Sequence, residues 1–109
     1  MHEVKLSPAA GEDIVGIREY ISIELKNPAA ALSVVSRILA RTRILRNHPE
    51  AGKPLSSVLD VQTDYRFLTS GDYLIFYRYE EETIFVTRIL YGRRDYTRIL
   101  FGDPPEPEA

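Results

Sequence analysis

Arginine and tyrosine gather in the last half of the sequence, and they are the residues best suited to chemistry in this chain. Six arginines fall on strand-like runs or just after them: Arg66, Arg78, Arg88, Arg93, Arg94 and Arg98. Tyrosines are interleaved with them: Tyr73, Tyr77, Tyr79, Tyr91 and Tyr96. Arginine forks bind phosphate or carboxylate, and tyrosine rings stack on planar groups. The cluster is interpreted either as a contact surface for a macromolecule or as structural ion pairs and sheet packing.

Other catalytic chemistries lack their residues. The chain has no cysteine, which excludes disulfides, thiolate zinc sites and cysteine nucleophiles. His2 and His48 are far apart and have no carboxylate pattern nearby, so we expect no metal site and no cofactor. The sequence shows neither a glycine-rich phosphate loop nor a nucleophile elbow. The run Glu80 to Glu82 fits an exposed turn, where burial cannot separate two carboxyl pKa values for acid–base catalysis.

Two helices are expected to follow a short N-terminal strand. The alternation in Glu3 to Leu6 predicts the strand. Ser7-Pro8 and Asn27-Pro28 are typical helix starts, with a capping side chain before a proline at the first helical position. They predict helices from Pro8 to Lys26 and from Asn27 to about His48, joined so tightly that they must form a hairpin.

Each predicted helix has one apolar stripe and a few apolar residues outside it. The first stripe consists of Ala10, Ile14, Ile17, Ile21 and Leu25. The second consists of Ala31, Val34, Val35, Ile38, Thr42 and Leu45. Outside these stripes lie Val15, Ile23 and Ile44, and three such residues on one hairpin suggest a surface for a partner.

The second half of the chain has the pattern of a three-stranded meander. Strand-like runs cover Tyr65 to Leu68, Tyr73 to Tyr79 and Thr83 to Leu90, after a loop over Glu50 to Pro54. Turns are expected at residues 70–72 and 80–82, and the segment from Arg93 to Phe101 fits a short helix or an edge strand. The order β-α-α-β-β-β predicts an α+β fold, in which an antiparallel sheet packs one face on the helical hairpin.

Length and charge predict one small domain. The 109 residues fit a single domain over residues 1–102, followed by an acidic, proline-rich tail over residues 103–109. Without a signal peptide, a membrane-spanning run or a cysteine, a cytoplasmic protein without membrane contact is expected. The net charge of −2 argues against a chain covered by nucleic acid. In the segment from Leu25 to Pro49, however, there are lysine and arginine residues but no acidic residue.

Five short stretches, taken in order, resemble the RelE/ParE-type toxins. The stretches Asp72 to Arg78 and Arg88 to Asp95 resemble the C-terminal half of these toxins. Leu6 to Ala10, Asn27 to Ala30 and His48 to Gly52 resemble their element junctions, so the likeness extends to about Phe101. The resemblance implies two N-terminal helices against a twisted antiparallel sheet. It also implies the toxin of a type II toxin–antitoxin system, of the kind used in plasmid stabilisation.

The resemblance further implies a cognate antitoxin that wraps and neutralises the domain. The contact would use the helical hairpin and the open sheet face, because an extended peptide at a sheet edge and a helix in a groove are standard binding modes. The basic second helix would suit an acidic antitoxin segment. The antitoxin-binding candidates are Val15, Ile23, Arg37, Arg41 and Ile44.

The branch of the superfamily decides whether the protein is an enzyme. RelE-like members cut messenger RNA on the ribosome without a metal, using basic residues and, in some members, a C-terminal tyrosine. Here the strand arginine of that branch falls at Tyr73, the later arginine falls at Arg94, and the tyrosine falls near Leu100 or Phe101. Two of the three groups are therefore absent, and each costs about 3 kcal/mol of transition-state stabilisation. This favours the ParE-like branch, whose best-known activity is inhibition of DNA gyrase by binding.

On this interpretation the chain is a binding inhibitor rather than an enzyme, and the toxin alone does not bind a specific DNA sequence. The first candidates for target contact are Arg93, Arg94, Tyr96 and Arg98, followed by Arg66 and Arg88, while Arg78 is expected to be structural. Two alternatives stay open: a ribosome-dependent mRNA endonuclease with a rearranged site, and a toxin fold that has lost its toxicity. A groove shared by Arg94, Tyr96 and Arg66 would favour the endonuclease.

Overall fold

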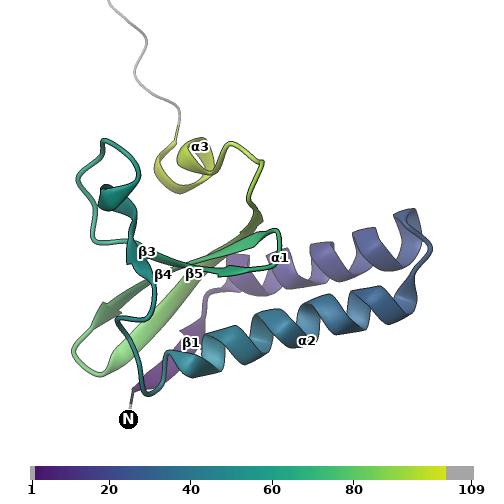
Figure 1. Cartoon of the computed structure of the whole chain (residues 1–109), viewed down its shortest axis with the longest axis horizontal. Coiled ribbons are helices and arrows are strands. Elements are labelled where there is room, and N and C mark those ends of the chain that lie inside the picture. Colours follow the sequence, from purple (N-terminus) through teal and green to yellow (C-terminus); the bar gives the residue numbers. More distant parts are fainter. Residues whose placement is uncertain (1, 103–109) are drawn as a thin grey trace, which may run out of the picture.

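The computed structural model describes residues 2–102, and the predicted acidic tail lies outside the described residues. The elements in chain order are β1 (Glu3–Leu6), α1 (Pro8–Glu19), the π-helical turn η1 (Tyr20–Glu24), α2 (Pro28–Ile44), β2 (Lys53–Pro54), the short 3₁₀ turn η2 (Leu55–Ser57), β3 (Arg66–Ser70), β4 (Tyr73–Glu80), β5 (Thr83–Tyr91) and α3 (Tyr96–Phe101). The predicted α+β class and element order are confirmed, and the segment left open between helix and edge strand is the helix α3 (Figure 1).

The two long helices begin where the sequence predicts. The Ser7 hydroxyl accepts a hydrogen bond from the Ala10 amide at 3.0 Å, and the Asn27 side chain accepts one from the Ala30 amide at 3.1 Å. Each bond satisfies an amide that has no partner within its own helix. Because these caps depend on neighbouring residues alone, the sequence was sufficient to predict both helix starts.

The end of the first helix differs from the expectation. The chain widens into η1 after Glu19, and Lys26 then takes a left-handed conformation with φ of 53°. A π turn holds more residues than an α turn, so it rotates the following side chains away from the apolar stripe. Leu25, expected on the inner stripe, is therefore 57% exposed, whereas Ile21 is buried.

The five strands form one sheet in the order β1-β5-β4-β3-β2. β3, β4 and β5 are the antiparallel meander that the sequence predicts. β1, whose pairing the sequence did not predict, pairs with β5 in parallel, so the complete sheet is mixed. Several elements separate β1 from β5 in the chain. Local alternation predicts that a strand forms, but it does not predict the direction of a distant partner strand.

The other edge of the sheet also carries an unexpected strand. Lys53 and Pro54 were predicted as loop but pair with Phe67 and Arg66 of β3 as the two-residue strand β2. Pro54 has no amide hydrogen, so this strand is restricted to the edge of the sheet and stays short.

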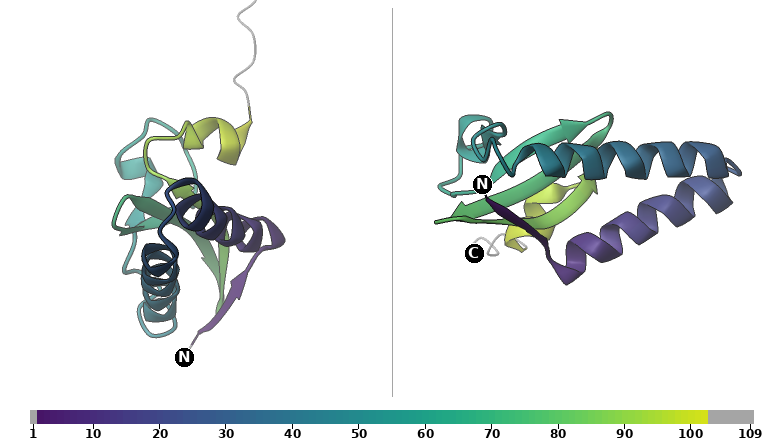
Figure 2. Two further views of the ribbon diagram at one scale, coloured as in Figure 1. Left: turned by 90° about the vertical axis from the view of Figure 1, so that its right-hand side faces the viewer. Right: turned by 90° about the horizontal axis from the view of Figure 1, so that it is seen from below.

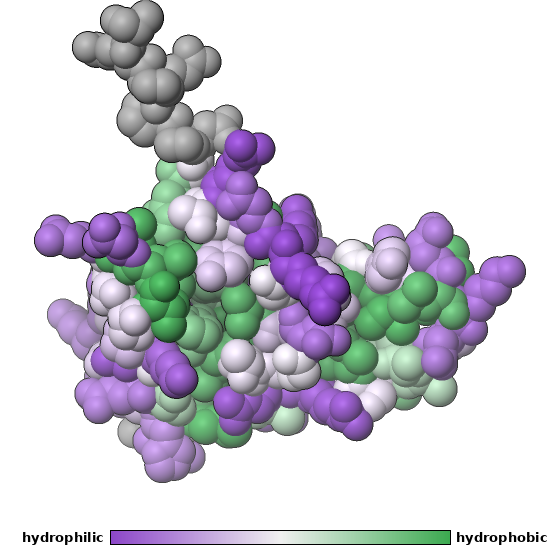
Figure 3. Space-filling model, turned by 45° about the horizontal axis from the view of Figure 1, so that its top comes forward, coloured by the Kyte–Doolittle hydropathy of each residue, from purple (hydrophilic) through white to green (hydrophobic). Residues whose placement is uncertain are grey.

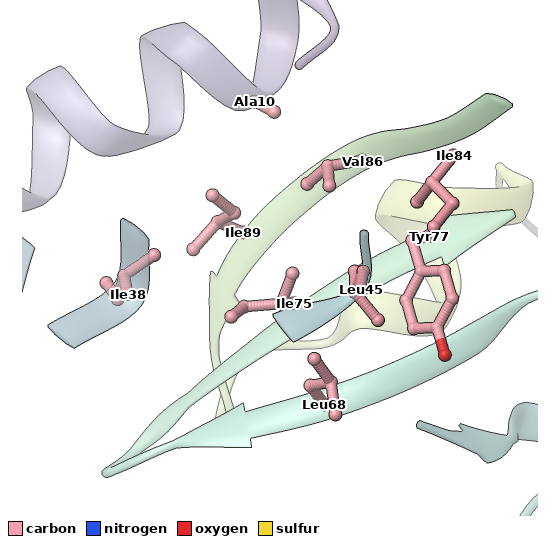
Figure 4. Close-up of a cluster of buried hydrophobic side chains, with 9 residues drawn as sticks. All are labelled: Ala10, Ile38, Leu45, Leu68, Ile75, Tyr77, Ile84, Val86 and Ile89. Atoms are coloured by element: carbon pink, nitrogen blue, oxygen red, sulfur yellow. The ribbon is translucent and has the colours of Figure 1, made fainter. Parts of the chain in front are cut away.

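The main core lies between the helical hairpin and one face of the sheet. Figure 4 shows Ala10 of α1, Ile38 of α2 and Leu45, which directly follows α2, facing buried side chains of the strands. The buried side chains of the sheet are Leu68, Ile75, Tyr77, Ile84, Val86 and Ile89. This arrangement confirms the prediction that one sheet face packs on the hairpin, because the buried positions of α2 follow the predicted stripe.

A second, smaller core lies on the opposite face of the sheet. Leu55, Phe76 and Leu90 are buried there, and side chains of α3 pack against them. The sheet is thus covered on both faces, although α3 contains no buried residue of its own. Phe76 and Tyr77 are neighbours on β4 that point to opposite faces, and both are buried because both faces are covered.

The hairpin is longer than the sheet that it covers. Its two helices run alongside the strands and continue past their end (Figure 1; Figure 2, right). The projecting part includes η1, which packs mainly on α1 and α2. Within residues 2–102 no helix has the length and apolar character needed to cross a bilayer.

Candidate functional site

Arg88 is held by an acidic residue of α1. Its guanidinium donates two hydrogen bonds of 2.8 Å to the Asp13 carboxylate, which also accepts the Ile89 amide at 2.9 Å. The hydrogen bonds that Arg88 donates to the Asp13 carboxylate raise the pKa of Arg88. β1 ends opposite Val86. Beyond that point, within residues 2–102, the edge of β5 has no strand partner on this side, and Asp13 accepts the hydrogen bond of its Ile89 amide. The structure therefore assigns Arg88 a bridging position between α1 and the sheet.

Arg78 lies at the end of β4 in an ion pair. It binds Asp64 at 2.8 Å and 3.2 Å, and its guanidinium lies over the Tyr65 ring, 5.0 Å from the centroid. The hydrogen bond from Arg78 lowers the pKa of Asp64. Both side chains are largely exposed, so water screens the pair and its contribution to stability is small. This arrangement fits the expected structural role of Arg78.

Arg66 lies beside a shallow hollow near the β2 edge. It donates to the Gly52 carbonyl at 2.8 Å and approaches the Tyr79 ring at 6.0 Å. The hollow is lined by Pro54, Thr63, Asp64, Tyr65, Arg66 and Tyr79. Neither Arg94 nor Tyr96 lines it. In the described part of the chain, the groove that would favour the endonuclease is therefore not formed by these three residues.

Arg93 and Arg94 project from the segment between β5 and α3. Both residues are exposed. Within residues 2–102 neither side chain has a hydrogen bond or an ion pair. Their guanidinium groups are thus available to a partner, in contrast to those of Arg66 and Arg88.

α3 carries the other two candidates for target contact. The Asp95 side chain caps α3 by accepting the Arg98 amide at 3.4 Å and lies 3.8 Å from the Arg98 guanidinium. The helical turn thus brings Arg98, three residues further on, to Asp95. Tyr96 is partly buried and packs on Phe76 with ring centroids 5.3 Å apart, so it anchors α3 to the sheet.

Two tyrosines pack together at the start of β4 and the end of β5. Tyr73 and Tyr91 are register partners whose ring centroids lie 5.8 Å apart. Burial raises the pKa of Tyr73, and Asp72, Tyr91 and Tyr20 add to the rise. We call Tyr73 and Tyr91 the tyrosine pair. The sequence analysis named both residues but could not show that they pack on each other, because that depends on the register of β4 and β5.

The hairpin exposes the apolar residues that the sequence placed outside its stripes. Val15, Ile23 and Ile44 are 43%, 65% and 37% exposed. Leu32, which was not predicted to be part of this surface, is 70% exposed. Figure 3 shows hydrophobic residues gathered toward the outer end of the hairpin. Such a patch on a small domain is typical of a protein interface.

The two predicted basic residues of α2 differ in their surroundings. Arg41 reaches across to the sheet, where its Nε donates to the Thr69 carbonyl at 3.1 Å. Arg37 is exposed. The structure thus brings Arg41 to the β3–β4 hairpin and leaves Arg37 on the outer surface of the helix.

Comparison with known proteins agrees with this arrangement. A family model described as the ParE toxin of the type II toxin–antitoxin system parDE matches residues 4–96. A solved structure, the chromosomal ParDE TA system from P. aeruginosa, has a TM-score of 0.69 and 24% identity, covering 84% of this chain and 96% of that chain. At this identity the likeness concerns the fold. No curated protein matches the sequence. The family match spans nearly all of the described fold, and the chain belongs to the ParE toxin family of type II toxin–antitoxin systems.

Proposed function

We propose that this chain is a toxin that inhibits DNA gyrase by binding and does not cleave RNA. On this proposal residues 1–102 form the toxin domain, which acts in the cytoplasm and serves plasmid stabilisation. The observation that supports a binding role most directly is the exposed pair Arg93 and Arg94, which has no side-chain partner within residues 2–102. Exposed guanidinium groups next to an anchored helix can form directed contacts to carboxylates of a protein target.

The proposed target surface consists of main contact residues and of residues that contribute less. Arg93, Arg94 and Arg98 supply the charge, and Tyr96 fixes the helix that carries Arg98. Arg66 and Arg88 would contribute less, because their guanidinium groups already bind Gly52 and Asp13.

The positions of the endonuclease groups argue for the binding role. Tyr73 occupies the strand position of the missing arginine and is packed against the main core. Leu100 packs in the second core and Phe101 lies edge-on to Tyr65, with centroids 5.8 Å apart, so neither supplies a hydroxyl. A metal-free cleavage site needs several charged or hydroxyl groups directed at one phosphate. Within residues 2–102 the Arg94 side chain has no hydrogen bond or ion pair to such a group.

A proposed antitoxin surface lies on the hairpin. It consists of the exposed apolar residues Val15, Ile23 and Ile44 together with Arg37 and Arg41. Apolar anchors surrounded by positive charge suit an amphipathic segment with an acidic face.

Two experiments test the function. Purified chain should inhibit DNA supercoiling by gyrase and leave ribosome-bound transcripts intact. Induced cells should become filamentous and show a DNA-damage response while their messages stay whole. Cleaved transcripts that reappear whole after Arg94→Ala would assign the endonuclease activity instead. A chain with neither effect would be a toxin fold without toxicity.

Neutralising Arg93 and Arg94 together should weaken gyrase inhibition about 10- to 100-fold, because each lost charged contact costs on the order of 1 kcal/mol or more. The midpoint of thermal unfolding should not change, since neither side chain has a partner within residues 2–102. The measurement compares the concentration for half-maximal inhibition of supercoiling by wild type and by Arg93→Ala/Arg94→Ala. The matched control, Arg43→Ala/Arg46→Ala, removes two exposed arginines of the hairpin region. Equal losses in both double variants would show that net charge, not this segment, determines inhibition.

A further inference from the structure

The hairpin has an outer face that no element within residues 2–102 covers. α1 and α2 bury Ala10 and Ile38 against the sheet, and the side chains on the other side of each helix point away from it. On that side Val15, Ile23 and Leu32 are 43%, 65% and 70% exposed. We define the outer face by its exposed residues on α1 and η1, which are Glu12, Val15, Glu19 and Ile23, and on α2, which are Leu32, Arg37 and Arg43.

The two halves of the hairpin carry opposite charge on this face. α1 and η1 expose three acidic residues and one basic residue: Glu12, Glu19, Glu24 and Arg18. α2 exposes Arg37 and Arg43 and contains no acidic residue. Within residues 2–102 none of these charged side chains is in an ion pair. The face therefore has an acidic half and a basic half, and each half is available to a partner of opposite charge.

A second copy of the chain supplies both complementary halves at once. A two-fold axis parallel to the helices places α1 of each copy over α2 of the other, so that an acidic half meets a basic half twice. A two-fold axis across the helices would instead place α1 on α1 and α2 on α2, with like charges facing each other. The charge pattern thus selects one of the two symmetric arrangements.

The positions of the residues along the helices agree with the first arrangement. α1 and α2 run side by side in opposite directions and are connected through η1 and residues 25–27 (Figure 2, right). Residues equally far from this connection therefore lie at about the same height. A displacement of about one helical turn brings three pairs together between the copies: Glu19 with Arg37, Glu12 with Arg43, and Ile23 with Leu32. Two ion pairs and one apolar contact thus form in a single register, and the symmetry doubles them.

The outer face approaches the size of a standard protein interface. The 17 residues of α2 span about 25 Å, and two adjacent helices are about 20 Å wide. The projected area is therefore about 500 Å² per copy. The accessible area is larger because side chains protrude, and a standard interface buries about 800 Å² per partner. Ser33, Ser36 and Ala40 are exposed between Leu32 and Arg43, and their small side chains let a partner helix approach closely.

We propose that the free chain forms a two-fold symmetric dimer through the outer face, with the acidic helix of each copy lying on the basic helix of the other. The dimer concerns the chain without antitoxin, because Val15, Ile23 and Arg37 also belong to the antitoxin surface proposed above. One face cannot hold both partners, so the dimer and the antitoxin exclude each other. The dimer does not depend on which target the toxin inhibits.

Sedimentation equilibrium of the purified full-length chain tests the dimer. At low salt the chain should have the mass of a dimer, with a Kd on the order of 10 μM, a moderate affinity for an interface of this size. Raising the ionic strength from about 0.05 M to about 0.5 M should weaken the dimer several-fold, because salt screens exposed charges.

Charge reversal tests the pairing of the helices. Glu12→Arg/Glu19→Arg should weaken the dimer about 100-fold, because both helices of each contact are then basic. Arg37→Glu/Arg43→Glu should weaken it equally, because both helices are then acidic. An equimolar mixture of the two variants should form a heterodimer with a Kd close to that of the wild type, because every basic half again faces an acidic half.

The control is Glu80→Arg/Glu82→Arg, which makes the same change in charge at the exposed turn between β4 and β5. It should leave the Kd within about threefold of the wild type, since it lies outside the outer face. Melting followed by circular dichroism checks that each variant is folded, because like charges within one hairpin lower its stability. If a double reversal does not fold, the mixture of the single variants Glu19→Arg and Arg37→Glu gives the same test.

Three outcomes would overturn the dimer. The wild type could stay monomeric at low salt even at about 1 mM, far above the expected Kd. The charge-reversed variants could dimerise as tightly as the wild type, or their mixture could form no heterodimer. A monomeric wild type whose binding to the antitoxin is lost in Arg37→Glu/Arg43→Glu would assign the outer face to the antitoxin alone. A failure to inhibit gyrase would contradict the proposed function and leave the dimer standing, because gyrase takes no part in these measurements.

Discussion

Asp13→Ala is expected to lower the free energy of unfolding by about 3 kcal/mol, because it leaves a partly buried guanidinium and a backbone amide without their acceptor. The Asp13 side chain is 10% exposed and that of Arg88 is 27% exposed. Water can therefore rehydrate part of Arg88, which keeps the loss below that of a fully buried pair. Asp13 also joins α1 to the edge of β5 where β1 has ended, so one substitution weakens the packing of the hairpin on the sheet.

Urea unfolding followed by circular dichroism measures this effect, since the chain has no tryptophan. The melting temperature should fall by roughly 15 °C for a domain of this size. Glu12→Ala, which changes an exposed neighbour on the same helix, is the control and should shift stability by less than about 0.5 kcal/mol. Asp13→Asn should fall between the two, since an amide oxygen can still accept the Ile89 amide. An unchanged midpoint in Asp13→Ala would show that the Arg88 contact contributes nothing to folding.

Tyr77→Phe is expected to cost about 2 kcal/mol, because the lost hydroxyl serves two backbone groups in the interior. It donates to the Pro49 carbonyl at 2.7 Å and accepts the Gly52 amide at 2.9 Å, and Tyr77 is fully buried. Gly52 lies so close that a Cβ on it would meet the hydroxyl at 2.7 Å. The hydroxyl thus binds the segment after α2 to β4. A phenylalanine ring fills the same space but makes neither hydrogen bond.

The same hydroxyl predicts a dependence on alkaline pH. Burial raises the pKa of Tyr77 above its ordinary value. The folded chain therefore keeps this proton when the unfolded chain loses it, so the stabilisation is complete below about pH 10 and decreases as the pH rises through the folded-state pKa. Wild type should lose stability between pH 9 and pH 11 more steeply than Tyr77→Phe in urea titrations. A slope that is equal in both chains would leave Tyr73, whose pKa is also raised by burial, as the source.

The parts of the fold that follow from neighbouring residues were predictable from the sequence. Ser7 and Asn27 cap the helices through bonds to residues three positions on. The stripe that contains Ile38 and Leu45 repeats with the helical period and is buried as expected. In both cases the information lies within one or two turns of the chain.

The features that depend on distant partners were not predictable. Leu25 leaves the stripe because a π turn intervenes, and β1 runs parallel to a strand that comes much later. The same limit applies to the arginines of the candidate site, because their partners lie far away in the sequence. Arg88 and Arg94 look alike in the sequence, but Arg88 binds Asp13 of a helix far away in the chain while Arg94 stays exposed. A single sequence does not show which arginine meets an acid.

The parallel pairing of β1 with β5 also determines when the protein can finish folding during its synthesis. The contact between Ser7 and Thr87 joins residues 80 positions apart. At synthesis rates of about 5–20 residues per second, the first strand waits several seconds for its partner to leave the ribosome. Until then the hairpin can form, but the sheet edge next to it stays open. The apolar face of the hairpin therefore stays uncovered during synthesis until the sheet that buries it is complete.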